Sequence, residues 1–219
     1  MRLEDYTAEA ICQSMGLATF IEPAWSLAQR PTLRTIFKPS FHSELCVTLT
    51  QQDGIGRLSV VAFRDQFWRS VHLARAAHDV EAMPVQVADI ERIIVAFRVA
   101  CTVIKPEQRT IAFDGMGTDS CVVSAGSVAV MEHRAGHERF GDDFLRELAR
   151  LAWETCQNPR IRNALADIFL YLGERYPQQT IPPESPTCQV SVAILGTPDE
   201  RQAVLPMLRH RGAPGADAT

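Results

Sequence analysis

Apolar side chains recur at helical spacing in two neighbouring stretches of the chain. Phe144, Leu148 and Leu151 fall on one face of a helix, and a second helix is predicted over residues 161–172. Asn158-Pro159 separates the two stretches, as an N-terminal cap followed by a first-turn proline does. The pattern therefore predicts two consecutive helices that share an apolar face.

Runs of β-branched and alternating residues predict strands earlier in the chain. Residues 44–50 and 57–64 favour strands, and the Asp-Gly turn between them predicts a hairpin. Residues 33–41 read as an edge strand, because a proline stands near its end. A further hairpin is predicted over residues 109–131.

The remaining segments give weaker patterns. Residues 5–15 and 87–101 have helical stripes, although the β-branched run inside the second leaves a strand there as an alternative. Residues 66–82 are predicted to be a surface loop or a weak helix. After a proline-rich loop at 174–187, the pattern predicts a strand at 189–195 and a capped helix at 197–208.

These elements together predict an α+β fold. We expect a mainly antiparallel sheet of about five or six strands with helices packed on one face. No stretch has the composition of a linker, so residues 1–210 are expected to form a single domain, followed by a disordered tail at 211–219.

Composition narrows the class of protein. Of the 219 residues, 46% are hydrophobic and 22% are charged, as in ordinary globular proteins. The formal net charge of −4 argues against a nucleic-acid surface, which is normally basic. No run is apolar for long enough to span a bilayer, and the N-terminus carries acids where a signal peptide is basic. We therefore expect a cytoplasmic protein.

Six cysteines stand mostly in apolar runs and form no C-x-x-C pair, which favours buried free thiols. They are Cys12, Cys46, Cys101, Cys121, Cys156 and Cys188.

Acidic residues gather around the start of the first of the two helices. Helix capping and solubility explain such acids in general, while an acidic docking patch for a basic protein partner is the functional alternative. Trp68 is a further candidate for partner binding, since aromatic side chains are enriched at interfaces, while a position in the core is the alternative. The acidic candidates are Glu132, Glu138, Asp142, Asp143 and Glu147.

Two patterns bear on catalysis. His133 and His137 have the spacing of metal ligands on a helix, but Gly136 and the missing glutamate favour a solvated loop. Asp114 and Asp119 flank a glycine-rich stretch that reads more simply as a hairpin turn. We therefore predict no catalytic set, no metal and no cofactor.

The order of elements between residues 88 and 172 carries one resemblance. A helix, a strand ending in Asp114-Gly115-Met116, further strands around Gly126, and a helix of the type Phe144-x-x-x-Leu148 follow one another. This order resembles uncharacterised bacterial α+β immunity-type proteins that are encoded beside secreted toxins. The resemblance implies a protein that binds a cognate toxin. The family shares no catalytic residues, so the resemblance assigns none to this chain.

The sequence thus leaves three functional hypotheses. The first is a cytosolic immunity-type protein that sequesters a toxin by occluding its active site. The second is a small hydrolase that uses Asp114 and Asp119, or a metal bound by His133 and His137. The third is a structural or adaptor subunit of a secretion apparatus.

Overall fold

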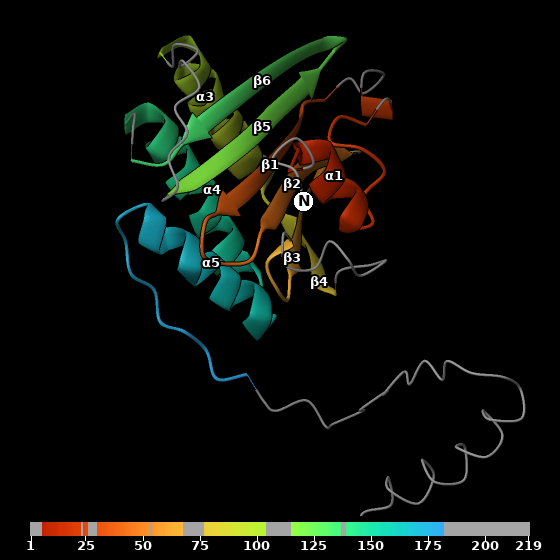
Figure 1. The fold of residues 1–219 in the computed structure, drawn as a ribbon. Coiled ribbons are helices and arrows are strands. Elements are labelled where there is room, and N and C mark those ends of the chain that lie inside the picture. Colours follow the sequence, from red (N-terminus) through yellow and green to blue (C-terminus); the bar gives the residue numbers. More distant parts are fainter. Residues whose placement is uncertain are drawn as a thin grey trace, which may run out of the picture. The chain divides into compact units, whose positions relative to one another are not determined.

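The computed structural model describes residues 6–22, 24–25, 30–52, 54–67, 77–103, 115–136 and 139–181 (Figure 1). These residues belong to one unit, Met1–Ile181. The predicted strand at 189–195, helix at 197–208 and tail at 211–219 lie outside them, as does the domain boundary predicted at residue 210.

Within the described residues, six strands form one sheet, and every neighbouring pair is antiparallel. Their order across the sheet is β4-β3-β2-β1-β5-β6, so the β5–β6 hairpin joins the first strand of a four-stranded meander. The predicted α+β class and strand number are therefore confirmed. The strands are β1 Thr32–Pro39, β2 Leu45–Gln52, β3 Ile55–Phe63, β4 His78–Val85, β5 Met116–Ser124 and β6 Ser127–Arg134.

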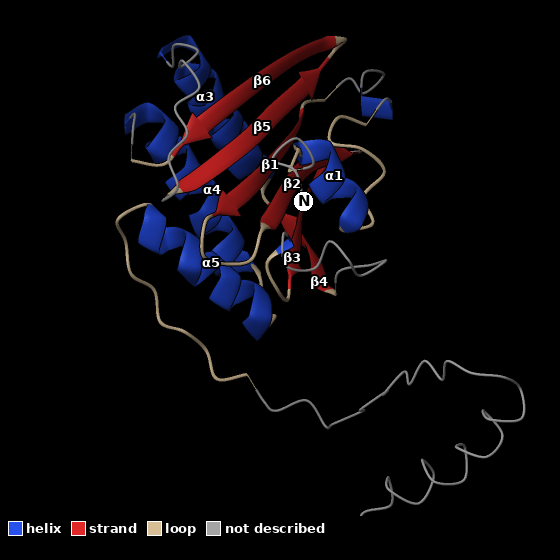
Figure 2. Cartoon of the chain, viewed as in Figure 1, coloured by secondary structure: helices blue, strands red, loops and turns tan. Residues whose placement is uncertain are grey.

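Helices lie on both sides of this sheet, as Figure 2 shows. Of the helices that the structure describes, the three longer ones cover one side, whereas the short N-terminal helix lies on the other, where no helix was predicted. Within the described residues, no helix is both long and apolar enough to cross a bilayer. The helices are α1 Ala8–Ser14, α3 Val87–Val103, α4 Arg139–Thr155 and α5 Pro159–Tyr171.

The side covered by α3, α4 and α5 holds the larger apolar core. Alternate residues of the strands, such as Leu33, Val47 and Val60, point to this side and are fully buried. Phe97 of α3 and Phe144 of α4 meet edge to face, with ring centroids 5.4 Å apart. Burying each such side chain stabilises the fold by about 1.5–3 kcal/mol.

The other side of the sheet has a smaller and more polar core. Ile11 and Cys12 of α1 pack against Ile36 and Cys46 of the strands, and all four are buried. Arg34 lies among them, 2% exposed, and its guanidinium bonds Thr48 and Glu22 and lies 4.4 Å from the Trp25 ring centroid. A buried arginine on this side is compatible with folding because its donors are satisfied.

Several local predictions are confirmed. Residues 87–103 form a helix rather than a strand, and β2 and β3 pair as the predicted hairpin. The Asn158 side chain caps α5 by accepting from the backbone N–H of Arg160 at 2.9 Å, with Pro159 as the first helical residue.

Three local predictions are wrong. Residues 33–41 were predicted to form an edge strand, but β1 lies inside the sheet between β2 and β5, with Pro39 as its last residue. Residues 78–85, predicted mostly as loop or weak helix, form the edge strand β4, whose polar residues conceal the alternation. The second hairpin turns at Ala125 and Gly126 rather than at residues 114–119, because Met116 to Asp119 already pair with β1 and β6.

Candidate functional site

The β5–β6 hairpin places a row of side chains at the outer edge of the sheet. Its two turn residues, Ala125 and Gly126, have φ angles of 45° and 78°, as a type I′ turn requires. This turn fixes the register, so that Glu132 pairs with Asp119 and Val130 with Cys121. Because Cys121 belongs to the core on the α1 side, Val130 and Glu132 point to that side as well.

The same register decides which backbone groups of β6 face outward. The Ala135 N–H donates to the Met116 carbonyl at 3.0 Å, so this pair exchanges ladder bonds. Ladder bonds alternate along an antiparallel pair, which leaves Val128, Val130 and Glu132 without bonds to β5. Their N–H and C=O groups therefore face away from the sheet, and no described strand pairs with them.

Two apolar side chains stand exposed along this edge. Val128 is 49% exposed and Val130 is 55% exposed, although both are β-branched residues in a regular strand. β6 carries neither proline nor lysine, the residues that commonly protect an edge. Unpaired backbone groups and exposed valines thus coincide along one face of the strand, and this coincidence makes the edge of β6 a candidate interaction site.

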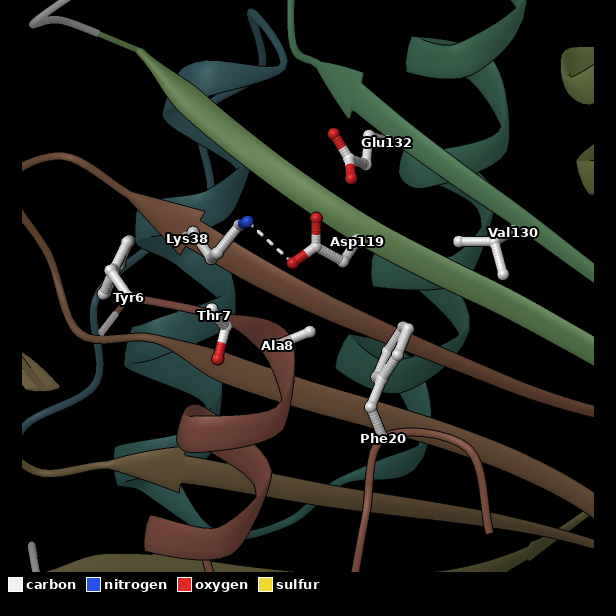
Figure 3. Close-up of a pocket in the computed structure, with 8 residues that line it drawn as sticks. All are labelled: Tyr6, Thr7, Ala8, Phe20, Lys38, Asp119, Val130 and Glu132. Carbon is white, nitrogen blue, oxygen red and sulfur yellow. Dashed lines mark hydrogen bonds and ion pairs between the residues drawn. The ribbon is translucent and has the colours of Figure 1, made fainter. Parts of the chain in front are cut away.

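A pocket of about 360 Å³ adjoins β6 on the α1 side (Figure 3). Within it, Lys38 Nζ of β1 lies 2.7 Å from Asp119 Oδ2 of β5, and Glu132 projects beside this ion pair. Apolar atoms come from Phe20 and Val130, so the pocket combines charged and apolar walls. Its lining residues are Tyr6, Thr7, Ala8, Phe20, Lys38, Asp119, Val130 and Glu132.

The buried carboxylate of Glu44 holds the segment before α1, which lines the pocket, in place. The Tyr6 hydroxyl donates to Glu44 Oε1 at 2.6 Å, and the Phe67 N–H donates to Glu44 Oε2 at 2.7 Å. Burial raises the pKa of the Glu44 carboxyl, and burial together with the Glu44 charge raises the pKa of Tyr6. Tyr6 therefore stays protonated as a donor and keeps the chain entering α1 against the sheet.

Asp142 does not belong to an exposed acidic patch, because it is buried. Its Oδ1 lies 2.9 Å from His133 Nε2, and the Gly136 N–H donates to both carboxylate oxygens at 3.0 Å. A carboxylate only accepts, so Nε2 of His133 carries the proton. Gly141 allows this arrangement, since a Cβ there would lie 2.6 Å from the imidazole ring.

The other predicted acidic residues do not form one surface either. Asp143 Oδ1 lies 2.8 Å from Arg146 Nη1, which offsets its charge. Glu147 is half-buried, and its Oε2 has no hydrogen-bond partner among the described residues. Glu132 is exposed and lies at the pocket. Glu138 and Trp68 lie outside the described residues.

The residues of the hydrolase hypothesis do not converge. Asp119 points to the α1 side of the sheet, whereas His133 points to the α4 side and is buried there. His133 is thus a core histidine at the end of β6 rather than part of a solvated loop. His137 and Asp114 lie outside the described residues, within which no three potential metal ligands cluster.

The described cysteines are free, and most are buried, as the sequence predicts. Burial raises the pKa of the Cys121 and Cys156 thiols to about 12, so neither is an activated nucleophile. Cys101 is half-buried, and Cys188 lies outside the described residues.

One polar cluster escaped the sequence analysis. The His42 Nδ1 lies 2.9 Å from the Tyr171 hydroxyl, and His42 Nε2 lies 3.7 Å from Asp167 Oδ1. The Phe41 N–H also donates to the Tyr171 hydroxyl, at 3.2 Å. These contacts fasten the β1–β2 connection to the end of α5, and their residues lie 125 to 130 positions apart, beyond the reach of any local pattern.

Comparison with known proteins gives no relative: no protein-family model, no curated protein and no solved structure matches this chain. The edge of β6 and its pocket are therefore interpreted from their geometry alone.

Proposed function

We propose that this chain is a protein-binding module that takes an extended segment of a partner onto the outer edge of β6. One observation carries the proposal: Val128, Val130 and Glu132 combine outward-facing backbone groups with exposed side chains. An added strand would satisfy those backbone groups and cover the valines in one step. Strand addition of this kind gives affinity through main-chain hydrogen bonds and specificity through alternate side chains.

The remaining polar groups support binding more than catalysis. Among the described residues, the histidine and the acid that the hydrolase hypothesis needs lie on opposite sides of the sheet. The pocket's ion pair, Lys38 with Asp119, is the kind of polar anchor that orients a bound segment.

In its specific form, the proposal is an immunity-type protein in the cytosol that occludes a secreted toxin. The net charge of −4 and the exposed Glu132 beside β6 favour a basic partner. Occlusion requires an interface of ordinary size, of which the edge strand would form the centre.

The test is co-expression of this chain with the product of each adjacent gene, scored by co-purification and host survival. Two matched variants locate the interface: Val130→Pro and Val80→Pro. Both valines are 55% exposed, and each occupies an outward-facing position of an edge strand, β6 and β4 respectively. Proline removes only an N–H that the sheet does not use, so we expect both variants to fold.

We expect a one-to-one complex with a neighbouring gene product that Val130→Pro abolishes and Val80→Pro retains. Rescue of the host from that product would establish the immunity form. Capture of a neighbouring product that is not toxic would support the binding module and contradict the immunity form. Equal capture by both variants would contradict binding at β6.

A further inference from the structure

We infer that the segment bound at β6 carries one lysine or arginine opposite Glu132, with apolar side chains opposite Val128 and Val130. This inference rests on the proposed strand addition and specifies the chemistry of the partner. It comes from the charges of the pocket and from the register of the edge.

The pocket holds more negative than positive charge. Asp119 and Glu132 face each other on neighbouring strands as a pair without ladder bonds, the geometry that brings side chains closest. Lys38 Nζ bonds Asp119 Oδ2 at 2.7 Å, and no described residue pairs with Glu132. Among the residues that line the pocket, one carboxylate is therefore in excess beside an exposed edge, and a cation is the group that compensates it.

The ion pair beside Glu132 is largely buried, although Glu132 itself is exposed. The side chains of Lys38 and Asp119 are only 18% and 12% exposed, so solvent screens the pair weakly. Phe20 and Val130 line the same pocket and offer apolar contact to the aliphatic stem of an incoming lysine or arginine.

The register of β6 predicts the sequence pattern of the bound segment. Val128, Val130 and Glu132 alternate along β6, so the partner's facing side chains alternate too. The expected segment reads apolar, any, apolar, any, basic, in one chain direction or the other. Arg134 is the next residue on the same side and disfavours a second cation there.

A second copy of β6 fits this edge less well. Antiparallel pairing that sets Val130 against Val130 places Glu132 opposite Val128, so the excess carboxylate stays uncompensated. Parallel pairing in register sets Glu132 against Glu132, which is repulsive. A basic segment from a different protein satisfies the valines and the carboxylate together.

The test uses two peptides with an N-terminal fluorescein, Ser-Val-Thr-Val-Thr-Arg-Thr-amide and its reverse, Thr-Arg-Thr-Val-Thr-Val-Ser-amide, which place arginine opposite Glu132 in parallel and in antiparallel pairing. Each is titrated with the full chain and followed by anisotropy, and the one that binds more tightly is taken as the arginine peptide. Its citrulline counterpart keeps the shape and removes the charge. We expect the arginine peptide to bind roughly two- to fivefold more tightly than the citrulline peptide, the range for an ion pair with an exposed carboxylate.

Protein variants assign that preference to the pocket. Glu132→Gln should abolish the preference, whereas Glu154→Gln, the same charge change at an exposed residue of α4, should retain it. Lys38→Gln should tighten the arginine peptide several-fold, because it frees Asp119 from its competing cation.

The outcomes separate this inference from the proposed function. Equal affinity for both peptides, with binding lost in Val130→Pro, would overturn the basic residue and leave strand addition standing. Absence of binding by either peptide, or binding that Val130→Pro leaves unchanged, would overturn both. A dimer of the free chain that Val130→Pro dissociates would replace the foreign segment by a second copy.

Discussion

The two edge strands of the sheet differ in how they are protected, although each exposes a valine to the same degree. Val80 of β4 and Val130 of β6 are both 55% exposed. On β4, the Arg64 N–H donates to the Ala77 carbonyl, so Val80 and Pro84 occupy outward-facing positions. Pro84 has no N–H to offer a new strand, and prolines at an edge block pairing.

Charged side chains of β4 also make contacts that hold this edge strand against neighbouring segments. Glu81 accepts from the N–H groups of Gln157 and Asn158 at 2.8 and 2.9 Å, which ties the strand to the start of α5. Asp79 is held by Arg64. On β6, by contrast, the outward positions include two valines and Glu132. Exposure of a valine alone therefore does not distinguish the two edges, whereas Pro84 and the charged contacts of β4 do.

The largest effect should come from the helix layer that supports both edges. Phe144→Ala removes a fully buried ring that packs on Phe97 and should lower the free energy of unfolding by about 3–5 kcal/mol. Chemical denaturation measures this loss. A change under about 1 kcal/mol would show that the helix layer does not hold the sheet that carries the two edges.

Glu81→Ala should selectively loosen β4. Removing the carboxylate leaves two backbone donors without their partner, which costs about 1–3 kcal/mol. Amide hydrogen exchange should quicken in β4 and at the start of α5 and stay unchanged in β6. Faster exchange in β6 to the same extent would contradict the independence of the two edges.

The anchor of the pocket wall gives a smaller effect that depends on pH. Since burial raises the pKa of Glu44, the folded state binds its proton more tightly than the unfolded state does. The stabilising contribution is complete below the unfolded pKa of about 4.3 and is lost as pH rises through the raised pKa.

Glu44→Gln removes this titration and keeps the shape of the side chain. We expect the unfolding free energy of the natural chain, relative to Glu44→Gln, to fall as pH rises from about 4.3 through the raised pKa of Glu44. Denaturation series of both proteins at each pH measure the difference, in which all other titrating groups cancel. Parallel pH profiles would show that Glu44 titrates alike in the folded and unfolded states.

The smallest effect concerns the exposed residues of β6 themselves. Glu132→Gln and Val130→Thr should each change the free energy of unfolding by no more than about 0.5 kcal/mol, because both side chains face solvent in the free chain. Urea denaturation tests this expectation. A larger loss would mean that these residues support the fold rather than a partner.

Local pattern predicted the helices and the first hairpin well, because periodicity and capping act within a few residues. The strand β4 was missed since an edge strand with histidine, aspartate and glutamate lacks apolar alternation. The second hairpin was misplaced because the glycines and aspartates near residues 114–119 imitate a turn, while the actual turn uses Ala125-Gly126.

The candidate site was less accessible to prediction than the fold. Glu132 was proposed for its charge and does lie at the pocket, but its companions, from Tyr6 to Asp119, come together only through the sheet. Asp142 was predicted to be a surface acid, but it is buried and contacts His133 of β6. Such pairings join separate elements of the fold, and no local spacing encodes them.

Amide hydrogen exchange in the free chain and in its complex with a captured partner tests strand addition at its centre. The outward N–H groups of Val128, Val130 and Glu132 should exchange quickly in the free chain and become protected in the complex. Those of Val80 and Ala82 on β4 should not change. Protection on β4 with none on β6, or protection on neither edge, would contradict strand addition at β6.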